Sequence, residues 1–563
     1  MSAPPNPPTP PAPPNSATPH THDGPPNSPH AASPASPALD AETLDPSADP
    51  VSGDRPRGRA PAAGGGLTED GRLRAGRLAG LTMPRAIWVL SWPIMVQSLL
   101  NSLVGLTDTV LAAGVSEAAT DAIGGASYIV WFIGLVMAAI GVGATALISR
   151  AVGGGRIAVA NAALGQATLL AVWSGVAVGV IVAAGAGPVA ALLNLNEEAS
   201  RAFRIYMYIN AVGAPLAALL LTGIECCRAA GDSLRPLWSM AAVNVVNIVV
   251  SWALAGVDFT RTRFIDGEAV TSVVLHNPFP FHLGVTGIAV GTLIGHTVGA
   301  AMVLRLLLAG RSGVVLRRRR LRPHWHTMRR LIRVGLPNFF EMLGMWVGNF
   351  AIVLMVGALA GAGGGVLGAH IVAIRVEAFS FLPGFAMGTA AAALAGQYLG
   401  AGSPRMAWRS TLACTGVASA IMGAMGAVFI FAPRTVVGVL TSQPTHLELV
   451  PKVLMVAGFF QVPFAVSLVL RSALRGAGDV KVVMWLTWIS TWGIRLPLAY
   501  ACSGVDLTLP PWLGGGVIDN PFWSTGENGG LVGLWAGLCA ELVIRAAMFA
   551  ARFIQGGWTR AAV

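Results

Sequence analysis

The stretch "RAAGDSLRPLW" at residues 228–238 returns as "RGAGDVKVVMW" at residues 475–485. Three further pairs of stretches match in the same order along the chain. They are "SWPIMVQSLLNSLVG" (91–105) with "GLPNFFEMLGMWVG" (335–348), "ALISRAVGGG" (146–155) with "ALAGQYLGAG" (393–402), and "GVTGIAVGTLIG" (284–295) with "GLVGLWAGLCAE" (530–541). Four ordered matches indicate an internal repeat, so the chain is predicted to consist of two related halves.

Both halves are built from apolar segments. Of the 563 residues, 54% are hydrophobic and 11% are charged, whereas a soluble domain carries about a quarter charged residues. Apolar runs of about 20 residues or more, each long enough to cross a bilayer as a helix, recur along the chain. The predicted spans are 86–113, 120–150, 158–187, 200–227, 235–256, 284–309, 331–360, 366–396, 406–432, 449–473, 482–503 and 530–553. We therefore predict an all-α integral membrane protein with twelve transmembrane helices in two pseudo-symmetric six-helix lobes.

Basic residues occupy every second loop between these spans. They gather at 150–156, 228–235, 317–330, 405–409 and 471–481, and again after the last span, while the alternate loops are acidic. This positive-inside pattern predicts a multi-pass protein of the cell membrane with both termini in the cytoplasm. The net charge of +11 then reflects topology, and nucleic acid is not expected as a partner.

The spans and the charges define the predicted domains. A proline-rich tail over 1–83 lacks an apolar run and is expected to be disordered and cytosolic. An N-terminal six-helix lobe over 84–310, a basic cytoplasmic linker over 311–328, a C-terminal six-helix lobe over 329–553 and a short tail over 554–563 follow. Because six is an even number, the halves are parallel repeats, and transporters of this type bind substrate between the repeats and rock them for alternating access.

Two long outward loops are predicted at matching places in the halves, over 257–283 and 503–529. Their segments "LHNPFPFHL" and "IDNPFWSTG" share Asn-Pro-Phe. We expect these loops to form small caps over the outer mouth of the protein.

Asp108 is an acid inside the first predicted span, in "VGLTDTVLAAG" (104–114). A carboxylate in hydrocarbon costs a few kcal/mol or more, and intramembrane acids are usually functional. Counted along the helices, Asp108, Asn247, Ser251 and Thr292 can all meet in the outer half of the N-terminal lobe. A lone carboxylate with amide and hydroxyl oxygens suits proton exchange or loose Na⁺ coordination and not a transition metal. The alternative, a buried aspartate that its polar neighbours satisfy, stays open.

The C-terminal half carries its own intramembrane charges: Glu341, Arg375, Glu377, Arg495 and Glu541. Arg375 and Glu377 are two residues apart and face different sides of a helix, so they are not expected to pair. Arg495 and Glu541 lie on the adjacent eleventh and twelfth spans and can pair. Internal charge pairs that lock the lobe and a substrate-facing role remain equal alternatives for this set.

The chain from 84 to 553 resembles the multidrug and toxic compound extrusion (MATE) transporters, in their bacterial, DinF-like branch. The resemblance rests on "WPIMVQSLLNSLVGLTDTVLAAG" (92–114), on "RAAGD" with its twin "RGAGD", and on "RVEAFSFLPGFAMGTAAAALAGQYLGAG" (375–402). It implies two six-helix lobes and the export of organic cations or other amphipathic compounds, driven by inward H⁺ or Na⁺.

The resemblance also implies roles for single residues. Family members carry an aspartate on the first helix fifteen residues after a proline, and Pro93 and Asp108 keep that spacing. An Asn-x-x-x-Asp pattern on the fifth helix is present only in its first half, because Ser251 replaces the acid that would follow Asn247. Thr292, in "GVTGIAVGT", matches a threonine on the sixth helix of those members.

Pro93 and Pro337 lie within predicted helices and are expected to kink them. No nucleotide-binding loop or nucleophile motif is evident, so an enzyme is not expected. Ion gradients must then drive transport, with H⁺ favoured over Na⁺ because the second acid is lost. We predict a monomeric, cation-coupled antiporter that needs no cofactor or metal besides its coupling ion, and whose partners are small-molecule substrates and the bilayer. The alternative is a flippase of a lipid-linked or polar-lipid substrate on the same superfold.

Overall fold

The computed structural model describes residues 66–193, 195–265, 268–360, 365–438, 443–508, 515–520, 522 and 530–561. The chain divides into two units, Met1–Ala60 and Pro61–Val563. All residues described below belong to the second unit.

The first half of this unit contains six long helices and one hairpin. They are α1 (Met83–Val115), α2 (Glu117–Gly153), α3 (Ile157–Leu192), α4 (Glu197–Ala229), α5 (Leu234–Ala255), the antiparallel pair β1 (Phe259–Ile265) and β2 (Glu268–Leu275), and α6 (Val285–Leu308).

The second half repeats this order with more interruptions. Its elements are η2 (Arg318–Leu321), α7 (Trp325–Ala360), α8 (Val366–Gly400), α9 (Pro404–Phe431), α10 (Pro433–Gly438), α11 (Pro444–Phe459), α12 (Gln461–Gly476), α13 (Val480–Trp488), η3 (Ile489–Arg495), α14 (Leu496–Ser503), β3 (Leu507–Thr508), β4 (Val517–Ile518), α15 (Gly530–Gln555) and η5 (Gly557–Arg560).

The helices match the predicted membrane spans. Among the described residues, nine helices are long and apolar enough to cross a membrane, and the pair α11 and α12, bent by 58°, makes a tenth span. The first and eleventh predicted spans correspond to α1 and to the continuous run α13–η3–α14. The prediction of an all-α membrane protein with twelve spans is therefore confirmed, with small hairpins only in its loops.

Proline explains the two interrupted spans. Pro463 has no N–H to donate to Phe459, and the helix breaks at Phe460 between them. Pro497 likewise cannot donate to Gly493, and the wide π-helical turns of η3 lie in the residues just before it. By contrast, α1 and α7 continue through Pro93 and Pro337, so the expected kinks do not break these helices.

The ordered chain extends beyond the predicted lobe boundaries at both ends. Residues 66–82, predicted as part of a disordered tail, are folded: Leu73 and Leu78 are each 1% exposed, and Arg77 Nη1 donates to the Arg311 carbonyl at 2.6 Å. In the predicted C-terminal tail, Trp558 is fully buried and stacks on Phe553 with ring centroids 5.1 Å apart. The prediction of disorder was wrong for residues 66–82 because a few apolar residues there reach the core, whereas residues 1–65 lie outside the described residues.

The loops that follow α5 and α14 make the same contacts in each half. The Asn277 N–H donates to Asp258 Oδ1 at 2.7 Å, and the Asn277 side-chain amide donates to the last turn of α5. Asn520 repeats both bonds, to Asp506 Oδ1 at 2.8 Å and to the last turn of α14. The bond from Asn277 holds the pKa of Asp258 below its ordinary value. The shared Asn-Pro-Phe motif thus closes the end of the helix that precedes each loop.

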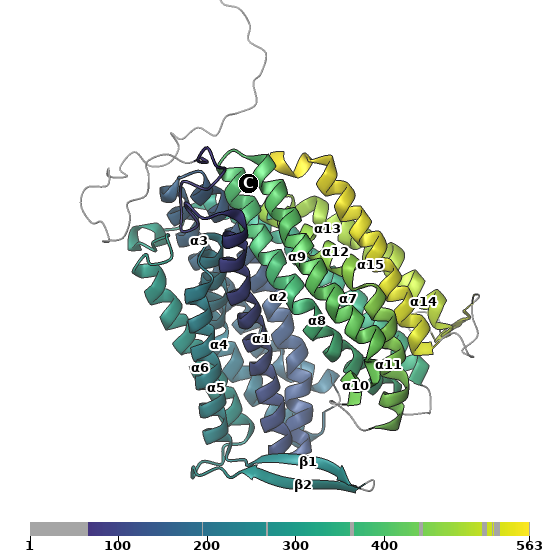
Figure 1. Ribbon diagram of the computed structural model, residues 1–563. Coiled ribbons are helices and arrows are strands. Elements are labelled where there is room, and N and C mark those ends of the chain that lie inside the picture. Colours follow the sequence, from purple (N-terminus) through teal and green to yellow (C-terminus); the bar gives the residue numbers. More distant parts are fainter. Residues whose placement is uncertain are drawn as a thin grey trace, which may run out of the picture. The chain divides into compact units, whose positions relative to one another are not determined.

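The β1–β2 hairpin lies at the end of the helices opposite the C-terminus (Figure 1). We call this the hairpin end and call the opposite end, which carries Arg150, Arg235 and η2, the basic end. Figure 1 also shows how α1–α6 and α7–α15 form two neighbouring groups of helices within this unit. These are the two predicted lobes.

The lobes contact each other at the basic end through a seam formed by Arg150, Gly153, Gln397 and Gly400. Arg150 donates to the carbonyl oxygens of Ala477 and Ala561, each at 2.8 Å, and Gln397 donates to the Ala229 carbonyl at 2.8 Å. The two glycines bring backbone against backbone, since a Cβ on Gly153 would lie 2.7 Å from Gln397 Cα and one on Gly400 would lie 2.8 Å from Arg150 Cα. The matched stretches 146–155 and 393–402 therefore form this seam with each other.

Candidate functional site

Three helices of the N-terminal lobe bring polar side chains to Asp108 on α1, which is 5% exposed. Tyr206 on α4 donates its hydroxyl to Asp108 Oδ2 at 3.0 Å. Thr292 on α6 donates to the same oxygen at 3.1 Å, and Asn247 on α5 donates to Thr292 Oγ1 at 2.9 Å. A chain of hydrogen bonds thus runs from Asn247 through Thr292 to the carboxylate.

Glycines on α6 make this meeting possible. Gly287, Gly291, Gly295 and Gly299 form a stripe at every fourth residue, and all four pack on α5. A Cβ on Gly291 would lie 2.7 Å from Ser251 Cα, so only glycine permits this approach. Small residues spaced by four are the usual means by which membrane helices come close. The close approach places Thr292 within hydrogen-bond distance of Asn247.

The four residues predicted to form the coupling site are brought together, but not all of them touch Asp108. Ser251 accepts from Asn247 Nδ2 at 3.3 Å and donates to the Ile288 carbonyl at 3.2 Å. In this chain of hydrogen bonds, Asn247 and Thr292 therefore separate Ser251 from the carboxylate. The Asn247 Oδ1 atom is buried and has no hydrogen-bond partner among the described residues.

Tyr206 is a site residue that sequence reasoning missed. It lies in "RIYMYIN" on the fourth span, one helical turn before Asn210, whose side-chain amide donates to the Tyr206 carbonyl. A buried tyrosine hydroxyl usually finds a hydrogen-bond partner. The sequence does show a tyrosine in the same lobe as a lone intramembrane aspartate. The spacing of residues along the chain, however, does not indicate that α4 packs against α1.

The arrangement can serve both charge states of Asp108. With the carboxylate ionised, Tyr206 and Thr292 both donate to it. The Thr292 hydroxyl also lies 3.2 Å from the Ile288 carbonyl. When Asp108 binds a proton, Thr292 can turn its hydrogen to that carbonyl and accept from Asp108 instead. The site can therefore exchange a proton without leaving a buried donor unpaired, which would cost about 1–3 kcal/mol.

The C-terminal lobe contains a second buried cluster, formed by Glu341, Glu541, Arg471, Arg475 and Arg545. Both carboxylates are fully buried. Glu341 on α7 binds Arg475 through both oxygens, at 3.0 and 2.7 Å, and accepts from Thr487 at 2.8 Å. Glu541 on α15 binds Arg545 at 2.6 Å and also accepts from Ser490. The predicted charge pairs inside this lobe are present, but with partners that the sequence did not indicate.

The predicted pairing of Arg495 with Glu541 is wrong. Arg495 donates to Asn349 Oδ1 on α7 at 3.1 Å, while Glu541 binds Arg545, which follows it by four residues on the same helix. Residues four apart lie on the same face of a helix, so Arg545 can pair with Glu541 whatever the position of the neighbouring helices. Arg375 is exposed and Glu377 is half-buried, and the salt bridges described do not join them, in line with their spacing.

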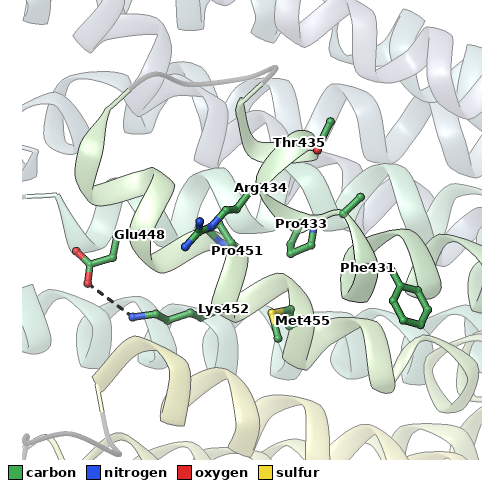
Figure 2. Close-up of a pocket in the computed structure, with 9 residues that line it drawn as sticks. Phe431, Pro433, Arg434, Thr435, Glu448, Pro451, Lys452 and Met455 are labelled. Atoms are coloured by element: carbon green, nitrogen blue, oxygen red, sulfur yellow. Dashed lines mark ion pairs between the residues drawn. The ribbon is translucent and has the colours of Figure 1, made fainter.

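A surface pocket of about 400 Å³ opens between the end of α9, α10 and α11 (Figure 2). Its lining includes Glu448 and Lys452, whose 3.6 Å ion pair is exposed. The pocket contains none of the predicted site residues and belongs to the C-terminal lobe, whereas Asp108 belongs to the other lobe. We therefore assign no part of the coupling site to it.

Comparisons with known proteins identify one family over both halves of the chain. The MatE family model matches residues 93–253 and 337–501, one segment in each half. A probable multidrug resistance protein NorM of Thermotoga maritima is 25% identical over 484 residues, which cover 84% of this chain and 93% of that protein. Multidrug resistance protein PmpM of Pseudomonas aeruginosa is also 25% identical, over 84% of this chain and 92% of its own.

A solved structure shares the fold. The MATE transporter VcmN of Vibrio cholerae in its bent form superposes with a TM-score of 0.71. The two chains are 18% identical, and the match covers 85% of this chain and 97% of that one. The likeness extends over both lobes and thus over the whole membrane region described above.

Proposed function

Because this chain belongs to the MatE family of multidrug efflux transporters, we propose that it is a proton-coupled antiporter that exports amphipathic small molecules. The family makes it a multi-pass membrane transporter of small molecules. The coupling ion, its binding residue and the class of substrate are the parts that we propose here.

The observation that carries the proposal is the hydrogen-bonded Asp108 site. A proton needs only one carboxylate oxygen, whereas a partly dehydrated Na⁺ needs several oxygen ligands. In this site Tyr206 and Thr292 direct hydroxyl hydrogens at Asp108, which leaves fewer lone pairs for a metal ion. Ser251 stands where a second acid would supply the further negative charge. These features favour H⁺ over Na⁺.

Coupling follows from the position of the site relative to the seam. Asp108 lies seven residues before the end of α1, about 10 Å from the hairpin end along the helix. We assign the basic end to the cytoplasm by the positive-inside rule, so that the seam closes the cytoplasmic side while Asp108 can load from outside. Proton binding then biases the two lobes between their states by its different affinity for each. One charge moved across 100 mV supplies about 2.3 kcal/mol.

Related proteins support a broad range of substrates. The matched proteins of Thermotoga maritima and Pseudomonas aeruginosa carry the name multidrug resistance protein. We extend this to the present chain as export of organic cations and other amphipathic compounds.

The proposal is tested in proteoliposomes with a panel of fluorescent dyes. Asp108→Asn removes titration but keeps size and polarity, and it is expected to abolish export against a gradient while expression and thermal stability are retained. Asp121→Asn is the matched control, because Asp121 is an exposed acid of the same lobe near the same end, and it should export as the wild type does.

The coupling ion is identified by imposing one gradient at a time. Export is expected under a pH gradient alone. It is not expected under a Na⁺ gradient at equal pH with an uncoupler present. Export that persists in the Asp108→Asn variant would remove Asp108 from the mechanism, and robust export under the Na⁺ gradient alone would overturn proton coupling.

A further inference from the structure

The buried cluster of the C-terminal lobe does not balance its charges. It holds two carboxylates, Glu341 and Glu541, against the three guanidinium groups of Arg471, Arg475 and Arg545. Each carboxylate has its own arginine at 2.6–2.7 Å, as described above. One positive charge, that of Arg471, is left over.

Arg471 is also the least satisfied member of the cluster. Its Nη1 lies 3.8 Å from Glu341 Oε1, beyond hydrogen-bond distance, and its nearest described acceptor is Met345 Sδ at 3.1 Å. A thioether is a weak acceptor. The Nε atom is buried and has no hydrogen-bond partner among the described residues. Its side chain, 16% exposed, is nevertheless the most accessible of the three arginines.

The neighbouring charges do not supply the missing anion. Arg495 acts electrostatically on Arg545 of the cluster, and Glu377 is a neighbour of Arg495. Glu377 can at most offset the positive charge of Arg495, so these two residues do not reduce the excess positive charge of the cluster.

The N-terminal lobe shows that the fold does not require this arginine. At the matching position of the repeat, in "IECCRAAGD" against "RSALRGAGD", stands Ile224. Gln97 matches Glu341, because each follows a helix proline by four residues. The matching Arg228 donates to Gln97 at 2.8 Å and pairs with Glu225 at 2.5 Å. One cation and one anion are balanced there, and the packing is built without a residue like Arg471.

Arg471 lies on a helix that contacts the other lobe. Its helix, α12, and the helix of Glu341, α7, both contact α2 of the other lobe. The seam bond from Arg150 reaches Ala477, six residues after Arg471, so Arg471 lies about 9 Å from the seam toward the hairpin end. Arg471 therefore belongs to a helix that contacts the other lobe, and the proposed exporter function places substrate between the two lobes.

We propose that Arg471 forms an anion-recognition site, which binds the carboxylate or sulfonate group of an amphipathic substrate. A buried charge in excess of its counter-charges is costly in a membrane region, and a planar guanidinium matches the two oxygens of a carboxylate or sulfonate group. The proposal rests on the proposed exporter function for the location of substrate between the lobes. It adds that the N-terminal lobe attracts cations through Asp108 while the C-terminal lobe attracts an anionic group.

The test measures binding and needs no ion gradient, so its outcome is separate from that of the coupling experiment. The purified full chain in phosphatidylcholine nanodiscs is titrated at neutral pH with pyrenebutyrate and, separately, with its uncharged methyl ester, against empty nanodiscs. Binding is followed by energy transfer from the tryptophans. In Arg471→Ile, which installs the residue of the N-terminal lobe, the acid is expected to bind about tenfold to hundredfold more weakly. The ester is expected to bind as before.

The matched control is Arg409→Ile, which removes one positive charge from an exposed site of the same lobe and should leave the affinity for both dyes unchanged. Thermal stability without dye is expected to stay equal or rise in Arg471→Ile, because Glu341 keeps Arg475. A fall in stability or a failure to fold would make Arg471 a structural counter-charge and overturn the proposal. The double variant E341Q/R471I reproduces the pattern of the N-terminal lobe, and persistent preference for the acid in it would overturn the proposal as well.

Two further outcomes show whether the Arg471 site binds the anionic group of a substrate or something else. Equal weakening of acid and ester binding in Arg471→Ile would show that the side chain contributes packing and not charge. Stabilisation of the wild type by chloride, with no preference for the acid over the ester, would assign the site to a small inorganic ion and overturn its assignment to substrate. The proposal is supported if the Arg471→Ile variant no longer binds the acid more tightly than the ester while its binding of the ester is unchanged.

Discussion

Gly153→Ala is expected to destabilise the state in which the lobes are closed at the basic end. In that state the new Cβ would lie 2.6 Å from the carbonyl carbon and 2.7 Å from the Cα of Gln397. Both are backbone atoms, so no side-chain rotation can relieve the contact. Because carbon atoms pack at about 3.5–4.0 Å, the two helices must separate by about 1 Å.

The size of the effect follows from the cost of overpacking. An extra methyl group in a tightly packed interior costs about 1–3 kcal/mol, which shifts the equilibrium about fivefold to 150-fold away from the closed seam. Gly400→Ala acts on the other side of the seam, where a Cβ would lie 2.8 Å from Arg150 Cα. We expect the same direction of shift from it.

The assay is the distance between spin labels at Ala158 and Arg405, two exposed positions at the basic ends of the two lobes. Cys226, Cys227, Cys414 and Cys539 are buried, and Cys502 is replaced by serine before labelling. Gly153→Ala should move population to longer distances and slow export. Gly185→Ala is the control, since a Cβ there meets nothing within 4 Å. An unchanged distance distribution together with normal export in Gly153→Ala would refute the role of the seam.

Two further outcomes are expected. Ser251→Asp restores a second acid beside the Asn247 Oδ1 atom, which has no hydrogen-bond partner among the described residues. It should raise the dependence of export on Na⁺, measured under a Na⁺ gradient at equal pH. Unchanged ion dependence would count against the argument that the lost acid favours H⁺. Protease added outside sealed cells should cut within 257–283 and leave 317–330 intact, and Asn277→Ala should hasten this cleavage because it removes the bonds to Asp258 and α5. Outside cleavage at 317–330 would invert the topology.

The helices and the coupling site were predictable for different reasons. Hydrophobic length and the repeat fixed the twelve spans, because a bilayer sets the length of any helix that crosses it. The family resemblance singled out Asn247 and Thr292, and depth supported grouping them with Asp108, since the predicted directions of the three helices allow the residues to meet in one half of the lobe. Their actual contact depends on the glycine stripe of α6, which brings that helix against α5.

The contacts that were missed depend on which helix faces meet. Tyr206 reaches Asp108 from α4, and nothing in its spacing indicates that α4 faces α1 at this depth. Arg545 lies on the same face as Glu541 and could have been proposed from its spacing of four. The partner of Arg495 was mispredicted because the eleventh span (α13–η3–α14) and the twelfth span (α15) are adjacent, but adjacency does not specify how each helix is rotated about its axis. The π-helical turns of η3 change that rotation further.

The two lobes keep their backbone features and differ in buried side chains. Gly153 and Gly400 occupy matching places in the repeat and close the seam together. By contrast, the residue fifteen positions after Pro337 is Ile352, where the other lobe has Asp108, and Ile224 occupies the place of Arg471. The contacts that join the lobes have to fit both halves at once, so a change on one side requires a change on the other. Buried positions inside one lobe carry no such constraint, and on the proposals above this freedom allowed one lobe to hold the proton site and the other the anion site.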